Sequence, residues 1–146
     1  MIGMEARLLR FAVAIGSLVP ICAGAAGVLV GPEMLRSVAA SPDLDSHFRY
    51  LSGLLLAIGI GFATTIPRIE ARGERFLLLT ALVVTGGIAR LVSVAAAGPP
   101  STPMIAALIM ELGVTPALAF WRHRVARAGQ TERGSLRKIG PSFTPG

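Results

Sequence analysis

Two charged residues stand inside stretches of the sequence that are otherwise apolar. Arg90 lies within residues 76–97, and Glu111 lies within the next apolar stretch, residues 103–121. An arginine near the middle of a membrane helix costs about 2.5 to 3.5 kcal/mol on insertion scales, so it requires a partner. A carboxylate beside a guanidinium can act as the proton partner of a ligand, or it can hold two helices in register.

Arg90 and Glu111 are expected at the same depth. Arg90 lies seven residues before Ala97, which is about 10 Å along a helix. Glu111 lies eight residues after Pro103, which is about 12 Å along the next helix. The short hairpin between the two helices makes them antiparallel neighbours, so we predict that Arg90 and Glu111 form a buried pair.

A second polar group lies where another apolar stretch, residues 48–66, begins. Its members are Asp45, His47, Arg49 and Tyr50. This helix begins on the same side of the membrane as the hairpin after Ala97. The sequence therefore predicts that these residues can join Arg90 and Glu111 in one polar cluster, the candidate ligand-binding site. His47 has no second histidine near it in the sequence, so we expect no metal site.

The chain carries none of the motifs of soluble enzymes. There is no P-loop, no dinucleotide-binding fingerprint, no G-x-S-x-G and no H-E-x-x-H. We therefore assign no catalytic residue and expect no cofactor. Glycines at helix-packing spacings, including Gly53 and Gly87, instead indicate faces where helices approach closely.

The elements that carry these residues are long, apolar and helical. Of the 146 residues, 53% are hydrophobic and 15% charged, against about 25% charged in soluble domains. Four apolar blocks predict an all-α, four-helix antiparallel membrane bundle, with spans at about 8–30, 48–66, 76–97 and 103–121. The bundle domain covers residues 1–127, and a basic tail, residues 128–146, is expected to be disordered. Residues 122–127 are expected to snorkel to the membrane surface.

The distribution of lysine and arginine predicts the orientation of the bundle. One side holds Arg7, Arg10, Arg68, Arg72, Arg75, Arg122, Arg124, Arg127, Arg133, Arg137 and Lys138. The opposite loops hold only Arg36. Because basic loops stay in the cytoplasm, both termini are predicted to be cytoplasmic. A cleaved signal peptide over the first helix is the alternative, although the apolar run continues through Val30, past a cleavage site near Cys22.

Three short motifs are similar to those of the DUF4345 family of small bacterial membrane proteins. They are His47–Leu54, Gly87–Ser93 with Gly98–Pro100, and Glu111–Leu112 followed by Pro116. The resemblance covers roughly residues 8–124 and implies a four-helix bundle in the bacterial inner membrane. The matched positions are Arg49, Gly53, Arg90, Ser93, Gly98, Pro100, Glu111 and Pro116. The family implies no reaction, and a looser similarity to DoxX-like membrane proteins hints at a quinone-linked role by analogy of fold only.

Two functions remain open from the sequence. In the first, the protein is a non-enzymatic membrane component in which Arg90 and Glu111 fix helix packing, within a homo-oligomer or a larger membrane complex. In the second, the polar cluster binds a small lipid-soluble ligand such as a quinone. The lipid bilayer is a partner in both cases. Nucleic acid is not expected, because no binding motif accompanies the basic residues.

Overall fold

The computed structural model describes residues 2–35 and 41–139, with side chains described in 3–35 and 41–131. Every regular element in these ranges is helical, which confirms the expected all-α class. The elements are α1 (Ile2–Val30), η1 (Gly31–Leu35), α2 (Pro42–Ala63), η2 (Ile66–Arg68), α3 (Gly73–Ala97), α4 (Thr102–Ile109), η3 (Met110–Val114) and α5 (Thr115–Ile139). η1 and η2 are 3-10 turns, whereas η3 is a π-helix.

Four of the described helical segments are long and apolar enough to cross a membrane. They cover residues 3–35, 42–68, 73–97 and 102–131. The fourth segment is continuous through α4, η3 and α5, which follow one another without a break. The prediction of four membrane-spanning helices is therefore confirmed.

Helices α1, α2, α3 and α5 each extend further than predicted at one end; α1, for example, begins at Ile2 rather than at about residue 8. α2 begins at Pro42 because Ser41 caps it: the Ser41 side chain accepts a hydrogen bond from the Leu44 N–H at 3.2 Å. Asp45 and His47 consequently lie within the helix rather than in a loop. At the other end of the chain, α5 continues to Ile139, through part of the expected tail. The remaining tail residues, 140–146, lie outside the described residues.

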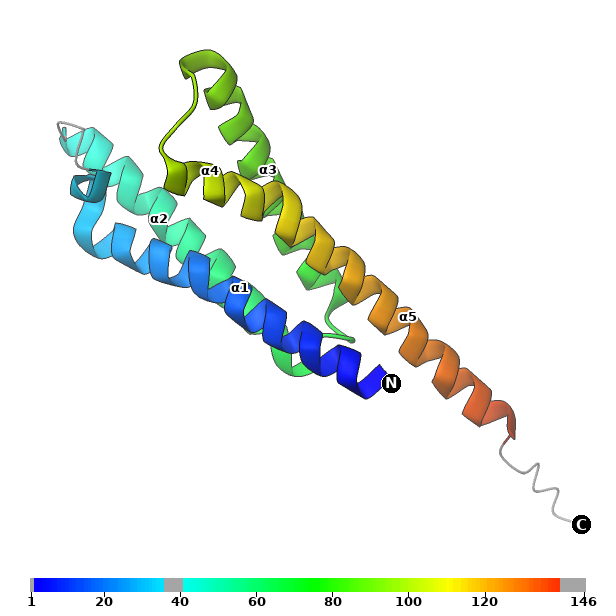
Figure 1. The fold of residues 1–146 in the computed structure, drawn as a ribbon. Helices are drawn as coiled ribbons and strands as arrows, with labels where there is room; N and C mark the ends of the chain where they lie inside the picture. The colour runs from blue at the N-terminus through cyan, green and yellow to red at the C-terminus, as the bar shows by residue number, and fades with distance from the viewer. Residues whose placement is uncertain (1, 36–40, 140–146) are drawn as a thin grey trace, which may run out of the picture.

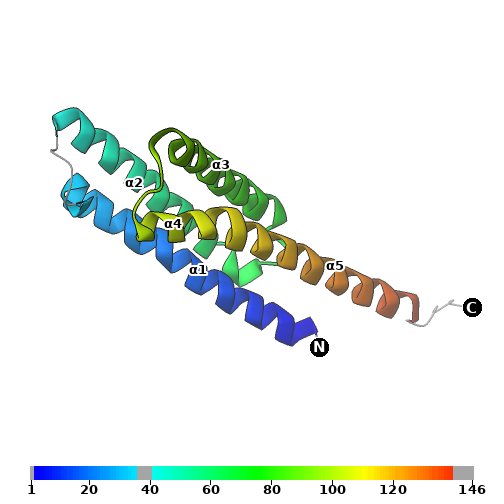
Figure 2. The ribbon, with the colours of Figure 1, turned by 45° about the horizontal axis from the view of Figure 1, so that its top comes forward.

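The helices form two antiparallel pairs that meet at one end of the bundle. Both views place α1 beside α2, whereas α3 accompanies the fourth segment (Figures 1 and 2). The N-terminus, η2 and the part of α5 around Arg122 lie at one end of the bundle (Figure 1). We call this the terminal end. The opposite end, with η1 and the 98–101 connection, is called the outer end.

The buried apolar core lies in the terminal half. It consists of Ala6, Leu9, Val13, Phe62, Ile69, Phe76, Ala119 and Val125. Phe62 and Phe76 meet edge to face, with ring centroids 5.1 Å apart. By contrast, none of the residues of α4 is buried. Among the described residues, the bundle is therefore packed most tightly towards the terminal end.

Small residues bring α1 and α2 into close contact. A Cβ atom added to Gly24 would lie 2.5 Å from the Leu56 backbone nitrogen, and one on Gly59 would lie 2.7 Å from Ile21 Cγ1. Such contacts require glycine, because any larger side chain would push the two backbones apart. Gly53 is different, since its added Cβ would make only an ordinary contact, 3.9 Å from Val28 Cγ2.

Replacing Gly24 should therefore destabilise the bundle. We expect Gly24→Ala to lower the thermal midpoint in detergent by several degrees, because overpacking costs about 1 to 3 kcal/mol. Gly86→Ala is the matched control, since an added Cβ there meets nothing within 4 Å. Circular dichroism melting curves measure both variants. Equal melting of Gly24→Ala and the unmodified protein would show that α1 and α2 do not need this close approach.

Candidate functional site

Arg90 and Glu111 are in contact between α3 and η3. The Arg90 Nε donates a hydrogen bond to Glu111 Oε1 at 3.0 Å and also lies 3.0 Å from Oε2. The Arg90 Nη1 is directed at the Met104 sulfur, 3.1 Å away. One guanidinium thus links α3 to two points of the fourth membrane segment.

A local widening of the fourth segment accompanies Glu111. In η3, the Thr115 N–H and the Thr115 hydroxyl both donate to the Met110 carbonyl, five residues back. Pro116 follows immediately; it has no N–H to give to the Leu112 carbonyl, and its ring would clash with that carbonyl in a regular α-helix. The π turn accommodates this proline. π turns inside α-helices occur frequently at functional sites.

Gly87 allows α3 to approach this widened turn. A Cβ added to Gly87 would lie 2.7 Å from Leu112 Cδ2 and 3.0 Å from Glu111 Cβ. Gly87 is buried, as a contact residue between helices should be. Gly87, three residues before Arg90, therefore lies where α3 and the fourth segment approach each other closely.

The Arg90–Glu111 pair is only partly enclosed. The Glu111 side chain is 16% exposed, whereas the Arg90 side chain is 38% exposed. Among the described residues, nothing donates a hydrogen bond to the buried Glu111 Oε2. A buried carboxylate oxygen normally accepts at least one hydrogen bond. The pair consequently retains a partly exposed guanidinium and a buried carboxylate oxygen that is in ionic contact with Arg90 Nε but accepts no hydrogen bond.

Arg49 makes a different kind of contact. Its Nε and Nη2 bind the two Asp45 carboxylate oxygens at 2.9 and 3.1 Å. Its Nη1 donates to the carbonyls of Val28 and Leu29, in the last turn of α1. These carbonyls have no partner within the helix, and a cation there is favoured by the helix dipole. Arg49 therefore fastens the end of α1 to the start of α2.

Gly31 provides the space for this fastening. Its φ angle is +77°, in the left-handed region that glycine adopts without steric cost. A Cβ at this position would lie 2.6 Å from Arg49 Nη2 and 2.8 Å from Asp45 Oδ1. The sequence position directly after α1 must therefore be glycine for two independent reasons.

The structure divides the polar cluster expected from the sequence into two pairs. Among the described residues, no hydrogen bond or ion pair connects Asp45 and Arg49 to Arg90 and Glu111. His47 and Tyr50 are exposed on α2. Within the described ranges, no group of three or more histidine, cysteine or acidic residues is placed to hold a metal ion.

Three further positions that match the family motifs, Gly98, Pro100 and Ser93, differ in how far the structure explains them. Gly98 has φ +89° and ψ −179°, a conformation open essentially to glycine alone, and it ends α3. Pro100 is exposed in the connection that follows. Ser93 is exposed on α3, and nothing in the structure explains its match to the family motif.

Arg122 is an important residue whose environment was predicted wrongly. Instead of snorkelling, its side chain is buried, and it donates to the carbonyls of Ile69 and Glu70 at 2.9 and 2.6 Å. A Cβ on Gly73 would collide with its guanidinium. The available signal was spacing: Arg122 lies three residues from Ala119 and from Val125, which both face the core.

Together these features define a multi-pass α-helical membrane protein whose helices are linked by arginine contacts. The chain belongs to a family described as a domain of unknown function (DUF4345), whose model matches residues 8–122. No curated protein and no solved structure is significantly similar to the chain. The looser similarity to DoxX-like proteins is not confirmed by these comparisons.

The contact around Arg49 can be tested through Gly31. We expect Gly31→Ala to lower the thermal midpoint more than Gly98→Ala. Both variants place alanine at positive φ, at a cost of about 1 to 3 kcal/mol each. Only Gly31→Ala also disturbs charge-assisted hydrogen bonds, each of which contributes about 1.5 to 3 kcal/mol. Equal losses, measured by circular dichroism in the same detergent, would mean that the Arg49 contact adds nothing to stability.

Proposed function

We propose that this protein is a non-enzymatic component of the bacterial inner membrane in which Arg90 and Glu111 fix the packing of the last two spans. The observation that supports this proposal best is the contact between them across α3 and η3. Gly87 brings the two helices within reach, and the π turn at Met110–Val114 carries the carboxylate. The pair thus sets the relative depth of two helices that share few other buried residues.

The low burial of the third and fourth spans supports a role within an oligomer or a larger complex. In the third and fourth spans, 11% and 6% of the residues in the most apolar window are buried, against 22% in each of the first two. Lipid can cover apolar surface, but it cannot satisfy a partly exposed guanidinium such as Arg90. A second copy or another membrane protein over this surface would enclose it.

A double-mutant cycle tests whether the pair fixes packing. Arg90→Gln and Glu111→Gln should each lower the thermal midpoint, because either one leaves an unpaired charge. The cost is about 3 to 5 kcal/mol for a fully buried pair, and the 38% exposure of the Arg90 side chain reduces it here. The double variant should recover most of that loss, since it removes both charges. Melting curves in one detergent measure all four proteins.

The outcome that contradicts the packing function is equally specific. If the two single variants melt like the unmodified protein, register does not depend on this pair. If the double variant loses the sum of the two single effects, the residues act separately rather than as a pair.

A second candidate function is the binding of a small lipid-soluble ligand such as a quinone. It is favoured by the unused acceptor on Glu111 Oε2 and by the exposed part of Arg90. A ligand carbonyl would accept from the guanidinium, and a hydroxyl would donate to the carboxylate. Arg49 does not support this site, because Asp45 and the α1 carbonyls already engage its nitrogens.

Native mass spectrometry in mild detergent distinguishes the two candidate functions within the same set of variants. A stoichiometric small molecule that is lost from a folded Glu111→Gln protein would establish the ligand site. If neither the unmodified protein nor any variant retains a molecule and the double variant recovers stability, the packing function is supported. The same spectra report whether the protein is a monomer or an oligomer.

We further propose that both termini lie in the cytoplasm. The segment from η2 to the start of α3 carries the basic residues Arg68, Arg72 and Arg75, and it lies at the terminal end with the N-terminus (Figure 1). Basic loops favour the cytoplasmic side. In a Cys22→Ala background, Ser41→Cys should react with an impermeant maleimide on intact cells. Glu74→Cys, at the opposite end of the bundle, should react only after permeabilisation. The reverse pattern would invert the topology.

A further inference from the structure

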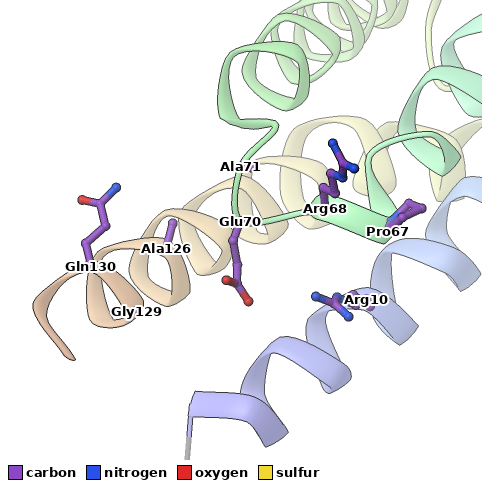
Figure 3. A pocket seen from close by; sticks show the side chains of 8 residues that line it. All are labelled: Arg10, Pro67, Arg68, Glu70, Ala71, Ala126, Gly129 and Gln130. Atoms are coloured by element: carbon purple, nitrogen blue, oxygen red, sulfur yellow. The ribbon is translucent and has the colours of Figure 1, made fainter. Parts of the chain in front are cut away.

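A hollow of about 350 Å³ opens at the terminal end of the bundle (Figure 3). It lies between α1, the η2 turn with the residues that follow it, and α5. Its lining comprises Arg10, Pro67, Arg68, Glu70, Ala71, Ala126, Gly129 and Gln130. Neither Arg90 nor Glu111 belongs to this surface, so it is separate from the site described above.

Two opposite charges line the hollow without neutralising each other. In Figure 3 the side chains of Arg10 and Glu70 point toward one another from α1 and from the turn after η2. Among the described residues, however, the ion pairs are Arg49–Asp45 and Arg90–Glu111 only. The Arg10 Nε is buried and finds no acceptor in the part of the chain whose side chains are described. A donor and an acceptor are therefore held apart, with space between them.

The hollow lies at the level where the membrane core ends. The charge-free stretch of the first span begins directly after Arg10, and that of the second span, which continues from α2 through η2, ends directly before Arg68. On the fourth segment, the charge-free stretch ends at Arg122, about 6 Å before Ala126 at the usual rise per residue. Three spans thus place the hollow at the depth of lipid headgroups, where basic pockets between helices bind them.

We propose that this hollow binds the headgroup of a phospholipid that carries a primary amine, of the phosphatidylethanolamine class. The phosphate accepts hydrogen bonds from the Arg10 guanidinium, and the ammonium group donates to the Glu70 carboxylate. Arg68 adds positive charge to the lining, although Figure 3 shows its guanidinium directed away from Arg10. The lipid tails remain in the bilayer beside α1 and α5.

The two facing charges determine which headgroup fits. A simple anion would satisfy Arg10 but would place a negative charge opposite Glu70, which is unfavourable. A phosphatidylcholine headgroup has a positive charge, but its quaternary nitrogen has no proton to donate to the carboxylate. A headgroup with phosphate at one end and ammonium at the other satisfies both side chains at once.

The test is competitive lipid retention by the full chain. The protein is exchanged in mild detergent into equal amounts of phosphatidylethanolamine, phosphatidylglycerol and phosphatidylcholine, and retained lipid is counted by native mass spectrometry. We expect several-fold enrichment of phosphatidylethanolamine over both other lipids. Arg10→Gln should abolish retention of all three, whereas Glu70→Gln should remove the preference over phosphatidylglycerol. Arg7→Gln, an exposed arginine outside the lining, is the matched control and should behave like the unmodified protein.

Each alternative outcome overturns the proposal in a recognisable way. Equal retention of the three lipids, unchanged in the Arg10 and Glu70 variants, would mean ordinary annular lipid. If inorganic phosphate displaces the bound lipid as well as phosphoethanolamine does, the hollow is a plain anion site. If Arg10→Gln does not fold, Glu70→Gln alone decides, because its effect on headgroup preference does not depend on that variant.

Discussion

A guanidinium placed below the lipid headgroups must find its hydrogen-bond acceptors within the protein, because the lipid tails supply none. Three arginines of this chain meet that requirement in three ways. Arg49 uses a carboxylate and the free carbonyls of α1, Arg122 uses the carbonyls of a turn, and Arg90 uses a carboxylate and a thioether. Each solution joins segments that are distant in sequence. Hydrogen bonds from three arginines therefore connect most of the helical segments of the bundle.

These polar contacts matter because apolar burial is unevenly distributed. The core residues of the terminal half, such as Phe62 and Phe76, pack as they would in a soluble protein. In the outer half, apolar side chains face lipid about as favourably as they would face each other, so packing there depends on close backbone approach and polar links. α1 and α2 have both, through Gly24 and Arg49. α3 and the fourth segment have Gly87 and the Arg90 pair.

The sequence predicted the fold class and the number of spans, because both follow from the length and spacing of apolar blocks. The equal depth of Arg90 and Glu111 followed from helix rise and a short hairpin alone. The ends of the helices were harder to predict from the sequence. Ser41 and Pro42 formed a capping signal at the start of α2, but the expected boundary was placed six residues later, at Phe48. The burial of Arg122 was missed because charge was given more weight than its position between Ala119 and Val125.

Two partners of Arg49 could not have been found from the sequence, because they are the backbone carbonyls of Val28 and Leu29. Backbone acceptors have no sequence signature except the helix end that leaves them free, here marked by Gly31. Arg49 was consequently grouped with Arg90 as a possible ligand anchor. Its carboxylate and carbonyl contacts engage all three of its nitrogens, whereas Arg90 shares a carboxylate whose second oxygen has no donor. Of the two charged pairs in the outer half, Arg90–Glu111 is therefore the one that keeps a buried carboxylate oxygen without a hydrogen-bond donor among the described residues.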